Sequence, residues 1–172
     1  MKIAIIGYSG AGKSTLAKEL SELYNITPLY LDSINFHPNW VKKEPSEVQE
    51  TIDSFLEEHE NFVVDGNWSK VFQNRFQIVD RIIFLNFNRF FCLKSVIKRY
   101  QENKGIVRYS CAPGCKDKID LEFIKWVLYK GRSKKQKEYY KDIINKYKDK
   151  VLVFKNRKEV NKFLEKEKKA CD

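Results

Sequence analysis

The chain has 172 residues, of which 42% are hydrophobic and 14% aromatic, enough to build the core of one compact domain. It has no apolar run near the roughly 18 residues of a membrane span. It also has no signal-like leader, and its 4 cysteines do not form a secreted disulfide framework, so we expect a cytoplasmic protein with no membrane partner. The formal net charge of +10 fits a polyanionic small ligand or nucleic acid and does not separate the two.

The N-terminal segment reads as a strand, a glycine-rich loop and a helix. Residues 2–6 form a short, apolar, β-branched run, which is typical of a buried parallel strand. Residues 14–23 place leucines on one helical stripe. Between them stands Gly7-Tyr8-Ser9-Gly10-Ala11-Gly12-Lys13-Ser14, followed by Thr15, with the spacing G-x-x-x-x-G-K-[ST]. This order is that of a P-loop.

A P-loop binds polyphosphate because its backbone N–H groups point into one hollow at the positive end of a helix. Lys13 adds a charge for the β- and γ-phosphates, and the Ser14 hydroxyl is a ligand for Mg²⁺. We therefore expect ATP and Mg²⁺ as cofactors. The predicted nucleotide-binding residues are Gly7, Ser9, Gly10, Ala11, Gly12, Lys13, Ser14 and Thr15.

The rest of the chain alternates between strands and helices. Further strands are expected at 29–31, 62–64, 81–85 and 151–154, and helices at 45–58, 90–102, 121–130, 133–147 and 158–168. Residues 32–40 read as a loop, and residues 105–120 as an irregular insertion. The pattern predicts a three-layer α/β/α P-loop NTPase fold with a parallel five-stranded sheet. We expect a single domain over residues 1–172, with a short lid at about 105–120.

Two aspartates end predicted strands at the edge of the sheet where the P-loop lies. Asp65 is a candidate to hold Mg²⁺ together with Ser14, directly or through water. Asp32 is a candidate to orient the group being phosphorylated or to accept its proton. Helix caps or turn residues are the alternative interpretation of both.

Arginines are the side chains best suited to stabilise a phosphoryl group in transfer, because guanidinium binds it in a bidentate manner. The candidates are Arg75, Arg89, Arg99, Arg108 and Arg132. Of these, Arg99, Arg108 and Arg132 flank or lie within the lid and are predicted to be catalytic; surface ion pairs are the alternative.

Other patterns are less specific. Cys111 and Cys115 supply half of a zinc site, and no histidine nearby completes it, so we expect loop cysteines without a metal. The aromatic residues Phe36, Trp40 and Trp68 are either core residues or the lining of an acceptor pocket. The lysines of the last third are either a solvated helix face or a surface for nucleic acid.

The P-loop, Val64-Asp65-Gly66 and the stretch from Asp120 through Tyr139-Tyr140 to the strand at 151–154 resemble adenylate kinase and its nucleoside monophosphate kinase relatives. A closer resemblance, over nearly the whole chain, is to the adenylate-kinase-like topology modulation proteins of bacteria. It is carried by Leu31-Asp32-Ser33, Asp65-Gly66-Asn67-Trp68-Ser69, Ile82-Ile83-Phe84-Leu85 and Phe123-Ile124-Lys125-Trp126-Val127-Leu128.

The resemblance implies a nucleoside monophosphate kinase-like fold with Lys13 and Ser14 on MgATP and Asp65 near the metal. It also implies lid arginines and an acceptor side. The chain departs from adenylate kinase where Asn67-Trp68 replaces an acceptor-binding arginine, a role that Arg75 would have to fill.

The sequence thus predicts a kinase that transfers the γ-phosphoryl group of ATP to a small acceptor, with a nucleotide or nucleoside favoured. The alternative is an ATP-dependent DNA-binding regulator, for which the chain has no base-reading motif. The oligomeric state is left open.

Overall fold

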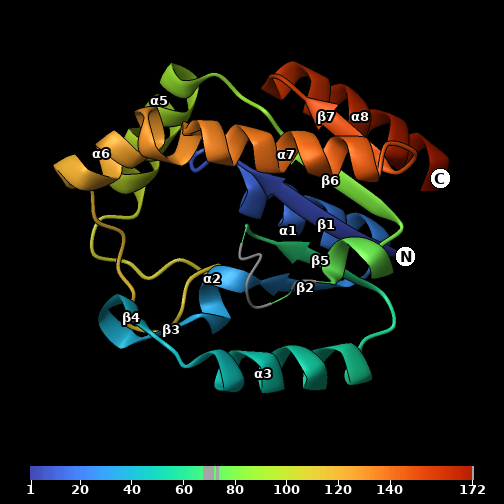
Figure 1. The fold of residues 1–172 in the computed structure, drawn as a ribbon, viewed down its shortest axis with the longest axis horizontal. Helices are drawn as coiled ribbons and strands as arrows, with labels where there is room; N and C mark the ends of the chain where they lie inside the picture. Colours follow the sequence, from blue (N-terminus) through green and yellow to red (C-terminus); the bar gives the residue numbers. More distant parts are fainter. Residues whose placement is uncertain (68–71, 73, 172) are drawn as a thin grey trace.

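The computed structural model describes residues 1–67, 72 and 74–171, and Trp68 and Ser69 lie outside that part. Its centre is a five-stranded sheet in which every strand pair is parallel (Figure 1). The strands, in spatial order, are β2 (Thr27–Tyr30), β5 (Phe62–Asp65), β1 (Lys2–Gly7), β6 (Arg81–Leu85) and β7 (Val151–Phe154). The predicted parallel five-stranded sheet is confirmed.

Helices cover the sheet at the positions that the sequence predicts. The long helices are α1 (Lys13–Tyr24), α3 (Pro45–Glu58), α5 (Arg89–Glu102), α6 (Leu121–Leu128), α7 (Lys134–Lys146) and α8 (Arg157–Cys171). Short elements are the helices α2 (Leu31–Ile34) and α4 (Arg75–Ile78), and the 3₁₀ turns η1 (Pro38–Trp40) and η2 (Lys130–Arg132). Of the described helices, none is long and apolar enough to traverse a bilayer.

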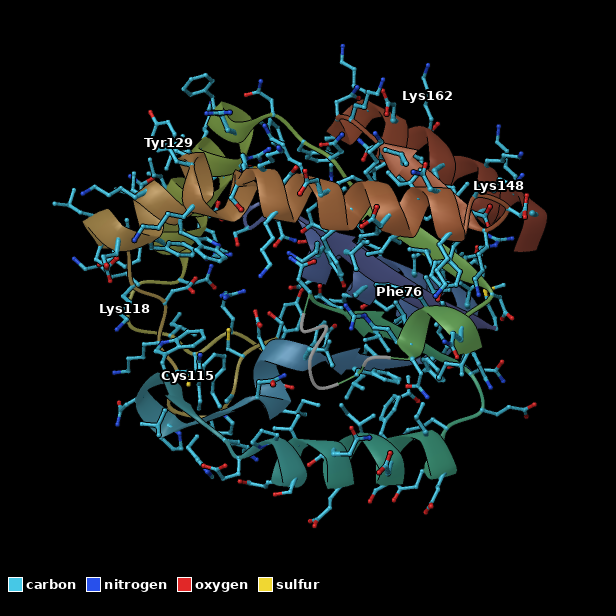
Figure 2. The ribbon with its side chains drawn as sticks, in the orientation of Figure 1. Phe76, Cys115, Lys118, Tyr129, Lys148 and Lys162 are labelled. Atoms are coloured by element: carbon cyan, nitrogen blue, oxygen red, sulfur yellow. The ribbon has the colours of Figure 1, made fainter. Side chains whose placement is uncertain are left out.

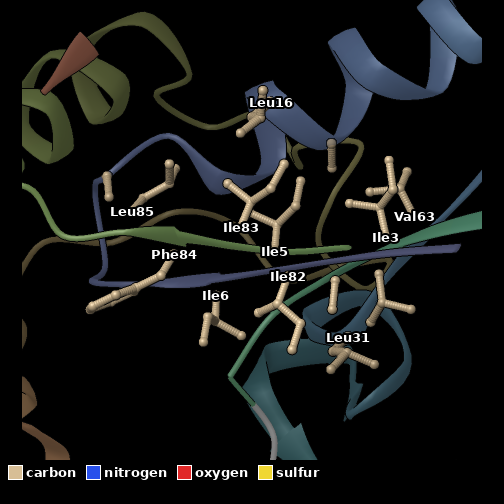
Figure 3. Packing of buried hydrophobic residues seen from close by; sticks show 14 of the residues in the cluster. Ile3, Ile5, Ile6, Leu16, Leu31, Val63, Ile82, Ile83, Phe84 and Leu85 are labelled. Atoms are coloured by element: carbon tan, nitrogen blue, oxygen red, sulfur yellow. The ribbon is translucent and has the colours of Figure 1, made fainter. Parts of the chain in front are cut away.

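Side chains alternate between the two faces of the sheet and pack against different helices. Figure 3 shows Leu16 of α1 over the face that carries Ile5 and Ile83, whereas Ile6 and Phe84 point to the opposite face. Burying one such side chain stabilises the fold by roughly 2 kcal/mol.

The opposite face is covered by α7 and α3. Tyr140 of α7 stacks on Phe84, with ring centroids 4.4 Å apart, and Phe55 of α3 contacts Phe62, with centroids 5.8 Å apart. On the first face, α1 also contacts α8. The result is the expected three-layer α/β/α arrangement, which leaves the carboxyl ends of the strands open.

The prediction that residues 32–40 form an irregular loop is wrong in detail. Most of α2, together with β3 (Phe36–His37) and η1, falls within these residues, and β3 pairs antiparallel, as a hairpin, with β4 (Val41–Lys42) directly after them. Two-residue strands have no periodicity to detect, and Pro38 and Asn39 mark only the turn between them.

Candidate active site

A cleft of about 1090 Å³ lies at the carboxyl edge of the sheet. Residues 9–15 of the P-loop line it, together with Asp32, Asp65, Arg99 and Arg108. The sequence therefore predicted most of the residues that meet there, although Gly7 and Arg132 do not line the cleft.

The P-loop has backbone angles that only glycine adopts readily. Gly10 has φ of 81°, and a Cβ placed on it would lie 2.4 Å from the carbonyl oxygen of Cys92. Gly12 has φ of 88° and directly precedes α1, whose first residue is Lys13. The loop therefore packs tightly against α5 and places the helix N-terminus at the cleft, where a phosphate would meet free N–H groups.

The P-loop side chains contact the end of β5. The Ser14 hydroxyl donates a hydrogen bond to Oδ2 of Asp65 at 2.5 Å. The Lys13 ammonium donates to the carbonyl oxygen of Tyr8 at 3.4 Å, so it lies over the loop that its charge would serve. Register places Asp65 on the same face of the sheet as Ile5, which is the face that α1 covers.

Asp65 is a buried carboxyl group with an unusual pKa. Burial raises its pKa to about 6, while Lys13 and the hydrogen bond from Ser14 act in the opposite direction, and the nearby Asp32 carboxylate raises it further. Oδ1 of Asp65 is buried without a hydrogen-bond partner in the described part of the chain. An orphaned carboxylate oxygen beside a serine hydroxyl suits Mg²⁺, which takes one or two protein oxygens and completes its shell with water and phosphate.

The side chain of Asn67 holds the first residue of the P-loop in place. It accepts a hydrogen bond from the Gly7 N–H at 3.1 Å and donates one to the Gly7 carbonyl at 2.7 Å. The sequence pattern marks Asn67 as part of the segment 65–69 that carries the resemblance, and as a replacement for an arginine, but does not predict this contact. Its pairing with Gly7 depends on contact between β5 and β1, which no local motif announces.

Two of the predicted arginines meet at one carboxylate. Nε of Arg99 and Nε of Arg108 lie 3.0 Å and 2.9 Å from the same oxygen, Oδ2 of Asp117. The Asp117 side chain is only 6% exposed, and all three residues line the cleft. We call this set the arginine clasp. Asp117 faces the Nε atoms of both guanidinium groups. Because two positive charges share one negative charge, the clasp has a net charge of +1 and can attract a phosphoryl group.

The other predicted arginines are engaged elsewhere. Arg132 donates to the Phe87 carbonyl at 2.9 Å, and its guanidinium lies 3.6 Å from the centroid of the Tyr8 ring, beneath the P-loop. Arg75 is fully buried and donates to the Phe72 carbonyl at 2.7 Å.

Arg89 lies over the ring of Tyr129, at 5.7 Å from its centroid. The positions of Arg75 and Arg132 oppose the expectation that either reaches a phosphate, because backbone carbonyls already bind these guanidinium groups.

The candidate lid packs against the hairpin. Residues 105–120 contain no helix or strand, as predicted, and Cys111, Ala112 and Cys115 form a small buried cluster with Phe36 and Trp40 packed on it. The Trp40 N–H donates to the sulfur of Cys115 at 3.3 Å, and Figure 2 shows Cys115 beside β3. Residues 105–120 and the hairpin of β3 and β4 therefore form one packed unit, which we call the lid–hairpin unit, at the cleft.

Cys111 and Cys115 serve this packing. The Cys115 thiol donates to the carbonyl of His37 at 3.3 Å. Over the described residues, no group of three or more His, Cys, Asp or Glu side chains is placed to hold a metal ion. Burial raises the pKa of the Cys111 thiol to about 11, which disfavours the thiolate that a metal would need.

Three further residues complete the rim. Asp32 lies in the first turn of α2 and lines the cleft. Tyr109 of the lid donates from its hydroxyl to the Ser14 carbonyl at 3.3 Å. A Cβ atom added to Gly12 would lie 3.3 Å from Nη1 of Arg157, at the start of α8. No local sequence pattern singles out Tyr109 or Arg157, since both reach the P-loop only through tertiary packing.

A sequence model of the AAA domain matches residues 3–110, well over half of the chain. The chain belongs to this family. No protein of curated function matches the AAA-domain chain in a sequence comparison. The family model covers the P-loop, Asp32, Asp65 and the first two residues of the clasp, and ends before Asp117.

Solved structures share the fold of this AAA-domain protein at low identity. Deoxyadenosine kinase from M. mycoides with bound dATP is 16% identical, with a TM-score of 0.53, over 90% of this chain and 91% of that one. Shikimate kinase from Bacteroides thetaiotaomicron is 18% identical, with a TM-score of 0.52, over 99% and 97%. An uncharacterized protein from Eubacterium ventriosum is 18% identical, with a TM-score of 0.53, over 99% of both chains. The AAA-domain chain therefore has a P-loop kinase-like fold.

Proposed function

We propose that the protein is a cytoplasmic, ATP-dependent phosphotransferase that acts on a hydroxyl group of a small molecule. The observation that carries this proposal is the 2.5 Å contact between Ser14 and Asp65, which places a buried carboxylate next to a P-loop inside a large cleft. A P-loop that only held a structural phosphate would not need the 1090 Å³ of space beside it.

The donor side of the site is the P-loop. The N–H groups of residues 9–15 bind the phosphates of ATP, and Lys13 neutralises the β- and γ-phosphates. Ser14 and Asp65 hold Mg²⁺, which when bound neutralises phosphate charge and orients the γ-phosphoryl group. The pairing of Asn67 with Gly7 keeps the loop in place during binding.

The acceptor side is the region between Asp32 and the lid–hairpin unit. Phe36, Trp40 and Tyr109 line this part of the cleft with aromatic rings. Such rings favour a planar acceptor, and we take a nucleoside or nucleotide as the leading class. The deoxyadenosine kinase with the same fold supports this choice by analogy.

In the proposed reaction, the acceptor hydroxyl oxygen attacks the γ-phosphorus of ATP, and the bond from that phosphorus to the β–γ bridging oxygen breaks. ADP carries away the bond's electron pair, and Asp32 accepts the proton of the hydroxyl. The clasp of Arg99 and Arg108 lines the cleft and stabilises the negative charge on the moving group.

The test is ADP release by the purified protein with MgATP and a panel of acceptors: nucleosides, nucleoside monophosphates, sugars, shikimate-like hydroxy acids and DNA 5′ ends. We expect one class to raise ADP release at least about tenfold over the acceptor-free rate, with ³¹P NMR showing a phosphorylated product. If no acceptor raises the rate, the proposal is overturned.

The exposed lysines of α7 and α8 support a second candidate, an ATP-dependent DNA-binding regulator like the topology modulation proteins. Lys162 of α8, and Lys148 in the segment after α7, extend from this side of the molecule in Figure 2. Acidic residues such as Glu138 and Asp142 interrupt the lysine pattern on α7, which weakens a phosphate-tracking surface. Duplex binding that changes with ATP and falls steeply with salt would favour this second function.

A further inference from the structure

One tryptophan of the cleft lining, Trp126, comes from α6. Trp126 of α6 is 48% exposed although its indole is packed on the chain. A Cβ on Gly131 would lie 3.0 Å from Nε1 of Trp126 and 2.9 Å from its carbonyl oxygen, so only glycine leaves room for the indole here. The ring is therefore held in place on one side and open to the cleft on the other.

The segment that holds this indole is attached to the P-loop. Gly131 precedes Arg132, whose guanidinium lies 3.6 Å from the centroid of the Tyr8 ring and donates to the Val127 carbonyl at 3.2 Å. Tyr8 is the second residue of the P-loop. Trp126 is thus fixed, through a short run of contacts, relative to the loop that would hold the triphosphate.

The part of the cleft that α5, α6 and Lys130 line, which we call the groove, combines aromatic side chains with paired charges. Phe91, which is 44% exposed, and Phe123 line it with Trp126. Lys98 and Lys130 also line it, but each faces a glutamate, at 3.6 Å from Glu102 and 4.0 Å from Glu122.

Aromatic walls without excess positive charge suit the face of a planar ring rather than a phosphate. Phe90 and Tyr129 are also exposed but do not line the cleft, so aromatic exposure alone does not define this groove.

We propose that Trp126 is the stacking platform for the base of the donor nucleotide, whose triphosphate lies in the P-loop. This inference rests on the proposed function and adds to it the placement of the donor base in the groove between α5 and α6. An indole can stack on any planar base. The platform would therefore bind purine nucleoside triphosphates with little discrimination between adenine and guanine.

The experiment compares ATP with inorganic tripolyphosphate, which has the phosphates but no base. Calorimetric titration of Trp126→Ala should show ATP binding weakened by about tenfold and tripolyphosphate binding unchanged, because base–aromatic stacking is lost and the P-loop is intact. Trp126→Phe should retain most of the ATP affinity. Phe90→Ala, an exposed aromatic residue outside the cleft, is the matched control and should bind both ligands like the parent.

Two measurements avoid dependence on the folding of the alanine variant. ATP, but not tripolyphosphate, should quench tryptophan fluorescence in a Trp40→Phe background, which removes the other described tryptophan that lines the cleft, and the quenching should be lost when Trp126→Phe is added. Nuclear Overhauser contacts should join the purine H2 or H8 protons to indole protons of Trp126 in the parent complex.

Unchanged ATP affinity in Trp126→Ala, equal weakening of both ligands, or quenching that persists when Trp126→Phe is added to Trp40→Phe would each overturn the inference while leaving P-loop binding intact. If the parent binds neither ligand, the proposed function itself fails, and the inference with it.

Discussion

The carboxamide of Asn67 makes two hydrogen bonds to the backbone of Gly7, one to its N–H at 3.1 Å and one to its carbonyl at 2.7 Å. This contact joins the loop after β5 to the first residue of the P-loop. It explains why an asparagine, rather than a phosphate-binding arginine, follows Asp65-Gly66: the side chain supports the donor site instead of reaching an acceptor.

Replacing Asn67 by alanine should therefore act on ATP binding. The N–H and carbonyl groups of the buried Gly7 lose their side-chain partner, which should lower the free energy of unfolding by about 1–2 kcal/mol. The loosened loop should weaken ATP binding in calorimetric titration. Asn145→Ala, an exposed asparagine on α7, is the control. Parent-like ATP affinity and stability in Asn67→Ala would contradict this role.

Asp65 should reduce stability at neutral pH. Its pKa, ordinarily 3.8, is raised to about 6 because burial disfavours the charged form. The folded state therefore binds this proton more tightly than the unfolded state, so the stabilising effect of protonation is complete below about pH 4 and is lost as the pH rises through about 6.

Asp65→Asn removes the buried charge. We expect it to raise the free energy of unfolding at pH 7.5 by about 3 kcal/mol in metal-free buffer, with a gain that shrinks as the pH falls to 4, and to abolish ADP release. Urea denaturation at several pH values measures this. A variant that is less stable than the parent at pH 7.5 would contradict the burial argument.

Asp117 should be needed for turnover more than for ATP binding. In Asp117→Asn the two guanidinium groups lose their shared charge partner, so Arg99 and Arg108 repel each other and separate. We expect kcat to fall at least about tenfold, with a change of less than about threefold in the Kd for ATP, because the clasp acts on the transferred group. Asp142→Asn on the exposed side of α7 is the control. An unchanged kcat would show that the clasp is only structural.

The Cys111 thiol should react slowly with alkylating reagents in the native protein. Burial raises its pKa to about 11, so few molecules carry the reactive thiolate at pH 8. Alkylation by iodoacetamide, followed by mass spectrometry of the peptide that contains Cys111, should accelerate continuously from pH 8 to 10.5 in the native protein. In denaturant the same peptide should react quickly at pH 8.5. A native rate that is already constant above pH 8 would contradict the raised pKa.

Local patterns allowed the fold and half of the site to be predicted. The spacing of residues 7–14 identifies the P-loop, and Asp65 is found because it ends a run of apolar residues that reads as a strand. The face that a strand residue takes follows from its alternation with its neighbours, so the placement of Asp65 beside α1 was accessible to reasoning from sequence.

The other half of the site depends on contacts between segments that are distant in the sequence. Asn67, Asp117 and Arg157 reach the site through packing, and nothing in their local sequence distinguishes them from surface residues. Arg132 shows the opposite case. Its position after the lid predicts a phosphate contact, but the carbonyls of Phe87 and Val127 lie within reach and bind the guanidinium beneath the loop.

In the proposed function, residues 9–15 bind the triphosphate of ATP with Lys13 as the charged ligand. Calorimetric titration of MgATP into the parent, Lys13→Ala and Lys18→Ala tests it most directly, since Lys18 is an exposed lysine on the same helix, paired with Glu22. We expect binding by the parent and Lys18→Ala, and affinity at least about a hundredfold weaker in Lys13→Ala, in line with the loss of a charge-assisted contact. Equal affinity of all three proteins for ATP would contradict it.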